Sequence, residues 1–112
     1  MQRNKVLSLA GLAARAGKLA SGEYIVENSI RSGEGYLVIV AEDASANTKK
    51  KFSDKCSYYQ VPILFTGTRE ELGRAIGKDF RASAVALDEG FAKAMLDAVG
   101  QRQKKEECVC QK

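Results

Sequence analysis

The spacing of apolar residues predicts five helices. Over residues 4–16, Val6, Leu9, Ala10 and Ala13 recur every three or four positions, which places them on one face of a helix. Gly17 follows this segment and is a suitable residue to end it. Further helices are predicted over residues 21–33, 45–59, 68–77 and 88–100, with Ser21, Thr68 and Asp88 as their N-cap residues.

Short apolar runs between these helices predict strands at residues 19–20, 36–41, 61–66 and 84–87. The runs Tyr-Leu-Val-Ile-Val-Ala at 36–41 and Val-Pro-Ile-Leu-Phe-Thr at 61–66 do not alternate apolar with polar residues, which is typical of buried strands. Strands therefore alternate with helices along the chain, and this order predicts an α/β fold. We expect a three-layer α/β/α sandwich, in which helices cover both faces of a central sheet of about four strands.

The length and composition suit one folded domain. The chain has 112 residues, of which 45% are hydrophobic and 29% are charged, as in ordinary globular domains. Residues 1–100 are assigned to this domain, and the polar residues 101–112 are expected to form a frayed tail. With 18 Lys and Arg against 14 Asp and Glu, the net charge of +4 favours a polyanionic partner without deciding the matter.

The absence of histidine argues against catalysis. The sequence contains no histidine, so the commonest general base and the commonest metal ligand are missing. Cys56, Cys108 and Cys110 do not have the spacing of a disulfide framework, and Cys108 and Cys110 alone make a poor zinc site because structural zinc takes four ligands. No secretory signal or membrane-spanning run is recognisable. We expect a cytoplasmic, non-catalytic monomer without cofactor, metal or membrane partner.

Two local features have alternative interpretations. Glu42 and Asp43 follow a predicted strand and would suit magnesium binding or phosphoryl acceptance, as in a receiver domain. A receiver domain also needs an acidic cluster on its first strand and a lysine on a late strand; this chain has neither, so an ordinary turn is favoured. The three lysines at residues 49–51 form a basic patch on one helix, for which a solvated face is the simpler interpretation.

The turn Ser21-Gly22-Glu23 opens the second predicted helix. Small residues at a helix N-terminus let a phosphate or a base edge approach the backbone N–H groups. Any capped helix has similar features, so this turn alone does not establish a binding site.

An ordered set of motifs carries a family resemblance. Residues 9–22 read Leu-Ala-Gly-Leu-Ala-Ala-Arg-Ala-Gly-Lys-Leu-Ala-Ser-Gly, residues 41–43 read Ala-Glu-Asp, and residues 71–77 read Glu-Leu-Gly-Arg-Ala-Ile-Gly. In this order the motifs resemble the L7Ae/L30e family of ribosomal proteins, and the first is similar to its bacterial YlxQ-like branch. The resemblance covers about residues 4–95.

The resemblance implies an α/β/α sandwich that binds RNA without catalysis. Typical members of the family bind a kink-turn, a sharply bent RNA motif with sheared G·A pairs, through the start of one helix and two loops. By position, the corresponding surface here consists of Lys18, Ser21, Gly22, Glu23, Tyr24, Ile25, Asn28, Arg31, Glu42, Asp43, Lys78, Phe80 and Arg81. Helix N-terminal N–H groups, basic side chains and an aromatic ring together suit phosphates and unstacked bases.

The chain departs from the kink-turn binders at three positions. Those proteins carry Asn-Glu two and three positions after the family glycine, and Lys three positions after that Glu, whereas this chain has Tyr24, Ile25 and Asn28. An isoleucine cannot accept hydrogen bonds from guanine edges.

Three functions therefore stay open. The first is an RNA-binding protein of ribosomal type, which recognises a kink-turn, a variant of it or another structured RNA. The second is a protein-interaction module on the ribosome or its assembly factors, with Tyr24 and Ile25 as an apolar contact patch. The third is a small enzyme built on Glu42 and Asp43.

Overall fold

The computed structural model of the protein describes residues 5–98. Its elements are α1 (Lys5–Arg15), β1 (Leu19–Ser21), α2 (Glu23–Ser32), β2 (Leu37–Val40), α3 (Ala46–Tyr59), β3 (Ile63–Phe65), α4 (Arg69–Ala75) and β4 (Ser83–Ala86). Residues 89–98 form a further helix. The predicted order of helices and strands is confirmed, with ends that differ by a few residues.

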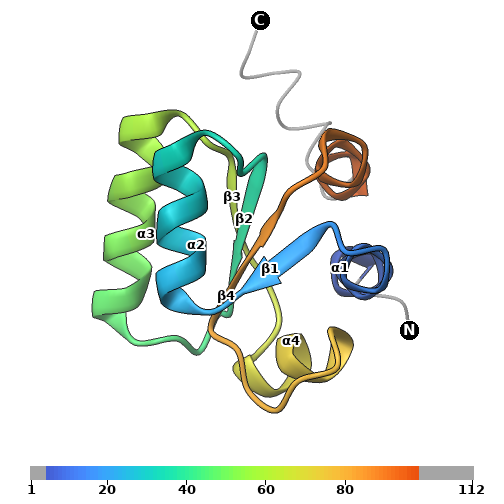
Figure 1. Ribbon diagram of the computed structural model, residues 1–112. Coiled ribbons are helices and arrows are strands. Elements are labelled where there is room, and N and C mark those ends of the chain that lie inside the picture. Colours follow the sequence, from blue (N-terminus) through green and yellow to red (C-terminus); the bar gives the residue numbers. More distant parts are fainter. Residues whose placement is uncertain (1–4, 99–112) are drawn as a thin grey trace, which may run out of the picture.

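The four strands form one mixed sheet in the order β1-β4-β2-β3. β4 pairs antiparallel with both β1 and β2, and β2 pairs parallel with β3. Helices α2 and α3 cover one face of the sheet, and α1, α4 and the helix at residues 89–98 cover the other (Figure 1). The predicted three-layer α/β/α sandwich is therefore confirmed.

The two central strands explain why their sequences lack alternation. Along β2, Leu37 and Ile39 pack against the layer that contains α1 and α4, whereas Val38 and Val40 pack against α2 and α3. All four side chains are fully buried because each face of the sheet is covered by helices. A strand between two helical layers favours apolar residues at every position; β4 follows this with Ala84, Val85 and Ala86, while its first residue is the small, buried Ser83.

The prediction that residues 61–66 form a second buried strand is wrong. The strand is shorter, β3, and it lies at the edge of the sheet, where it pairs with β2 alone within the described residues. Ile63 and Leu64 are half-buried and Phe65 is exposed. The central position next to β2 is taken by β4, whose small side chains gave a weaker strand signal in the sequence.

Some predictions concern residues outside the described part of the chain. Cys108, Cys110 and the expected frayed tail at 101–112 all lie there, so they stay predictions. Across residues 5–98, none of the helices has the length and apolar character needed to cross a bilayer.

Phe52 on α3 is the largest fully buried side chain of the core. We expect Phe52→Ala to lower the free energy of unfolding by about 3–5 kcal/mol, because the substitution leaves a cavity between α3 and the sheet. Tyr58→Ala removes an aromatic ring from the same helix at a position that is 80% exposed, and it should cost no more than about 1.5 kcal/mol. Urea unfolding measures both values, and equal losses would contradict the assigned core.

Candidate nucleic-acid interface

The sheet register brings most of the predicted site residues to one end of the molecule. Ser21 pairs with Ala84, and Val40 pairs with both Ser83 and Phe65. The carboxyl ends of β1, β2 and β3 therefore meet the start of β4. The segments that follow or precede these ends, residues 22–25, 42–43 and 78–81, make up what we call the strand-end surface; it lies at the lower end of Figure 1.

Three helices begin at this end of the sheet, and α2 differs from the other two. Ser45 caps α3, and Thr68 caps α4 in a complete capping box. The N-cap of α2 is Gly22, and no side chain caps this helix. The N–H groups in its first turn thus have no acceptor from a capping side chain, and a helix N-terminus carries a partial positive charge.

Gly22 keeps the start of α2 open. Its φ of 109° favours glycine, and a Cβ added there would meet no atom within 4 Å. Its N–H donates to the Ser83 carbonyl at 3.3 Å, and its carbonyl accepts from the Val26 N–H at 2.9 Å. The backbone is therefore fixed on the inner side, while the outer side is accessible to a ligand.

The prediction that Ser21 caps α2 is wrong. Ser21 is the last residue of β1, and its Oγ accepts a hydrogen bond from the Nε of Arg81 at 3.0 Å. With Ser21 as the cap, the helix would begin at Gly22; it begins at Glu23 instead, because Gly22 makes the turn between β1 and α2. Ser21 consequently positions Arg81 instead of satisfying a helix N–H group.

Arg81 ties the loop at residues 78–81 to two other elements. Besides its bond to Ser21 in β1, it donates from its backbone N–H to the Arg69 carbonyl at the start of α4. One guanidinium nitrogen also donates to the Phe80 carbonyl at 2.8 Å. These contacts hold the loop beside the start of α2, with the Phe80 ring 61% exposed.

Gly73 in α4 packs closely against the same loop. The Lys78 N–H donates to the Gly73 carbonyl at 2.7 Å. A Cβ added at Gly73 would lie 2.5 Å from the carbonyl oxygen of Asp79 and 3.0 Å from the Cα of Phe80. The loop can follow this path only because position 73 has no side chain. Residue spacing had marked Gly73 as part of a family motif but gave no sign of this contact.

Glu23 is directed toward α3. Its carboxylate lies 2.7 Å from the Nζ of Lys51. The carboxylate of Glu27 lies 3.4 Å from the same Nζ and 3.6 Å from the Nζ of Lys55. The hydrogen bond that Lys51 donates to Glu23 is the largest influence that raises the pKa of Lys51. Part of the predicted basic patch is thus neutralised by acids on the neighbouring helix, and Glu23 is paired.

Asp43 acts as a structural acceptor. Its Oδ1 accepts from the Arg69 N–H at 2.8 Å and lies 3.5 Å from Nε of the same residue. The Glu42 N–H donates to the Gly67 carbonyl at 2.7 Å, and its side chain is exposed. These contacts agree with the interpretation of the pair as a turn. Within residues 5–98, no group of three potential metal ligands is present.

Lys18, Asn28 and Arg31 lie away from the strand-end surface. Lys18 lies just before the first residue of β1, which pairs with Ala86. Gly22 follows the last residue of β1, at the opposite end of the strand. Arg31 is in the last turn of α2 and donates to Asn28 Oδ1 at 3.0 Å. Both are exposed, so they can reach a ligand only if it extends along α2 or past the opposite end of β1.

Three apolar side chains of the strand-end surface are exposed. Tyr24 is 73% exposed, Ile25 49% and Phe80 61%. Such side chains at an open helix start and on an adjoining loop can contact the flat faces of unstacked bases or an apolar protein surface.

Residues 4–96 match the ribosomal protein L7Ae/L30e/S12e/Gadd45 family. This chain belongs to that family. The chain is 48% identical over 88 residues to the RNA-binding protein YlxQ of Bacillus subtilis, an alignment that covers 79% of this chain and 88% of the relative.

Two solved structures have the same fold. One is a protein with unknown function from Bacillus halodurans, with a TM-score of 0.80, 46% identity and coverage of 83% of this chain and 94% of that one. The other is the 15.5 kD RNA-binding protein of Giardia lamblia, with a TM-score of 0.75, 23% identity and coverage of 85% and 82%; it shows the fold alone. The L7Ae/L30e resemblance of the sequence is confirmed, and membership of this family supports the predicted absence of catalysis.

The pairing of Lys51 with Glu23 and Glu27 predicts a pH-dependent contribution to stability. Because the pKa of Lys51 is raised in the folded state above 10.5, its stabilisation is fully present below that pH and is lost as pH rises through the folded pKa. We expect Lys51→Gln to be less stable than the unchanged protein near neutral pH, and the difference to close at alkaline pH. Thermal unfolding across pH measures this, with Lys50→Gln, an exposed lysine of α3, as the control. A difference that persists at alkaline pH would contradict the pairing.

The contact beneath the loop predicts a local effect of Gly73→Ala. The added Cβ must push the Asp79–Phe80 backbone away from α4, so the amide signals of residues 79–81 should shift in NMR spectra while those of α3 stay in place. Unfolding free energy should fall by about 1–3 kcal/mol, as for other overpacked sites. Unchanged loop signals would show that the close approach is not present in solution.

Proposed function

We propose that this protein binds structured RNA at the strand-end surface and performs no catalysis on it. The observation that carries the proposal is the uncapped start of α2 beside a loop that Arg81 holds in place. An RNA segment on this surface meets backbone N–H groups, basic side chains and an exposed aromatic ring at once. The description of the family as ribosomal and the name of the Bacillus subtilis relative as an RNA-binding protein support this choice of ligand.

Phosphate groups suit the start of α2. The N–H groups of its first turn point outward, and the helix dipole favours negative charge there. Lys78 adds a further exposed cation from the neighbouring loop. Such contacts position an RNA backbone without reading its sequence.

Base recognition would rest on Phe80. Its ring is exposed, while its backbone is held by Arg81 and by the close approach to Gly73. A ring on a fixed backbone loses little conformational entropy when a base stacks on it. The ligand is therefore an RNA with at least one unstacked base, which a kink-turn or another bent motif provides and a regular duplex does not.

The first turn of α2 distinguishes this chain from typical kink-turn binders. Glu23 is paired with Lys51, and the next two positions carry Tyr24 and Ile25. The carboxylate of this turn belongs to Glu23, two positions before the place where kink-turn binders carry their glutamate, so the acceptor for guanine edges is missing at that place. We infer that the RNA is a kink-turn variant or another structured RNA, not limited to one pattern of sheared G·A pairs. We also propose that the protein acts in the cytoplasm as a monomer.

We expect Phe80→Ala to weaken binding to a kink-turn RNA by roughly 5- to 150-fold, since stacking of one base contributes about 1–3 kcal/mol. Tyr58→Ala removes an even more exposed ring, 80% against 61% for Phe80, from the far end of α3 and should leave affinity unchanged. Fluorescence anisotropy of labelled kink-turn RNA and of a matched duplex, at low salt, measures both variants. Equal affinities of Phe80→Ala and Tyr58→Ala would contradict the assignment of the loop to the interface.

A protein-interaction module is the second candidate, because Tyr24, Ile25 and Phe80 expose apolar area on one surface. On this alternative the partner is a ribosomal or assembly protein. Absence of RNA binding at low salt, together with recovery of a protein partner after nuclease treatment, would favour it over RNA binding.

A further inference from the structure

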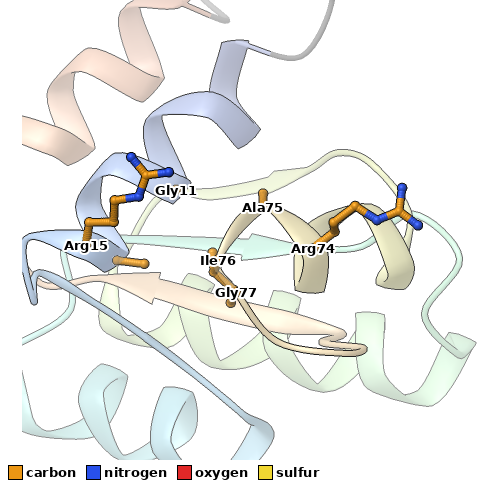
Figure 2. A pocket seen from close by; sticks show the side chains of 7 residues that line it. Gly11, Arg15, Arg74, Ala75, Ile76 and Gly77 are labelled. Atoms are coloured by element: carbon orange, nitrogen blue, oxygen red, sulfur yellow. The ribbon is translucent and has the colours of Figure 1, made fainter.

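A hollow lies between α1 and α4, next to the strand-end surface. It has a volume of about 220 Å³ and is lined by Gly11, Ala14, Arg15, Arg74, Ala75, Ile76 and Gly77. Figure 2 shows Arg15 and Arg74 on either side of the segment at residues 75–77, from α1 and from α4. Among the predicted site residues none lies in this hollow.

Four of the seven residues that line the hollow are Gly or Ala. The helices approach so closely at Gly11 that an added Cβ would lie 2.7 Å from the carbonyl oxygen of Ala75. Ala14 and Gly77 add little bulk, and a Cβ at Gly77 would meet no atom within 4 Å. The larger side chains of the lining are those of Arg15, Arg74 and Ile76.

The charged groups at the hollow are predominantly positive. Arg15 ends α1 and Arg74 lies in the last turn of α4, so the two cations offset the partial negative charge of these helix C-termini. Arg15 is exposed and has no ion pair with a described residue. Arg74 lies 2.7 Å from Glu70, but the two side chains are 73% and 59% exposed, and such pairs contribute little. Both guanidinium groups are thus available to an anion.

The hollow continues into the strand-end surface. Gly77 in its lining is followed directly by Lys78, and the loop then runs back along α4 to Arg81, whose N–H donates to the Arg69 carbonyl. The seven residues of α4 span roughly 10 Å at 1.5 Å per residue. The hollow therefore adjoins the Lys78 end of the loop, about the length of α4 from the Arg81 end.

We propose that the hollow binds a backbone phosphate of the same RNA, with Arg15 and Arg74 as its ligands. This inference rests on the proposed function, because the RNA must first lie on the strand-end surface. Arginine suits the role, since its planar guanidinium donates several hydrogen bonds to phosphate oxygens. The interface then extends from α2 across the loop to the opposite helical layer of the sandwich.

The test is the salt dependence of RNA binding by arginine variants. Each of Arg15→Gln and Arg74→Gln removes one phosphate contact, so each should weaken binding to the kink-turn RNA and lower the slope of log K against log salt by about 0.7–0.9. Glu70→Gln frees Arg74 and should strengthen binding. Lys50→Gln removes the same charge from an exposed position on α3 and should leave the slope unchanged.

The outcomes separate this inference from the function on which it rests. If the unchanged protein binds RNA and Phe80→Ala weakens binding, but both arginine variants keep the original slope, the hollow is not a phosphate site and the proposed function stands. If the unchanged protein binds neither RNA at low salt, both proposals are overturned. Slopes lowered in the arginine variants and kept in Lys50→Gln would establish the second contact.

Discussion

The antiparallel pairing of β4 with both β1 and β2 is the constraint on which the candidate surface depends. It aligns the start of β4 with the ends of its two neighbours, so the loop at residues 78–81 lies beside the start of α2. Full burial of β2 and β4 fixes this register, because a shift by one residue would turn each side chain to the other helical layer. The Arg81 bond to Ser21 then adds local rigidity to an arrangement that the sheet imposes.

Much of the fold was readable from the sequence because helices and buried strands leave strong apolar patterns. The apolar run at 36–41 and the capping box that begins at Thr68 both appear in the structure. Strand order was not readable. The run at 61–66 looks more buried than Ser-Ala-Val-Ala of β4, yet it forms the edge strand. Apolar character reports local burial, whereas position in the sheet depends on pairing between distant segments.

The candidate site shows the same limit. Family motifs selected Gly22, Phe80 and Arg81, but the actual contacts link residues far apart in the sequence. The bond between Ser21 and Arg81 arises only when β1 pairs with β4, and the pairing of Glu23 with Lys51 only when α2 packs beside α3. The charge on the surface is uneven: Glu23 and Glu27 of α2 pair with lysines of α3, whereas Lys78 and the two arginines of the hollow are exposed. A net charge of +4 alone does not indicate this distribution.

The most direct test of the central claim is to map RNA contacts on the protein by amide NMR during titration with a kink-turn RNA. If RNA lies on the strand-end surface, the amides of residues 23–25 and 78–81 should shift first and most, and those of residues 57–60 at the far end of α3 should not move. Shifts centred on residues 57–60 or on the edge strand β3, with the first turn of α2 unchanged, would contradict the account.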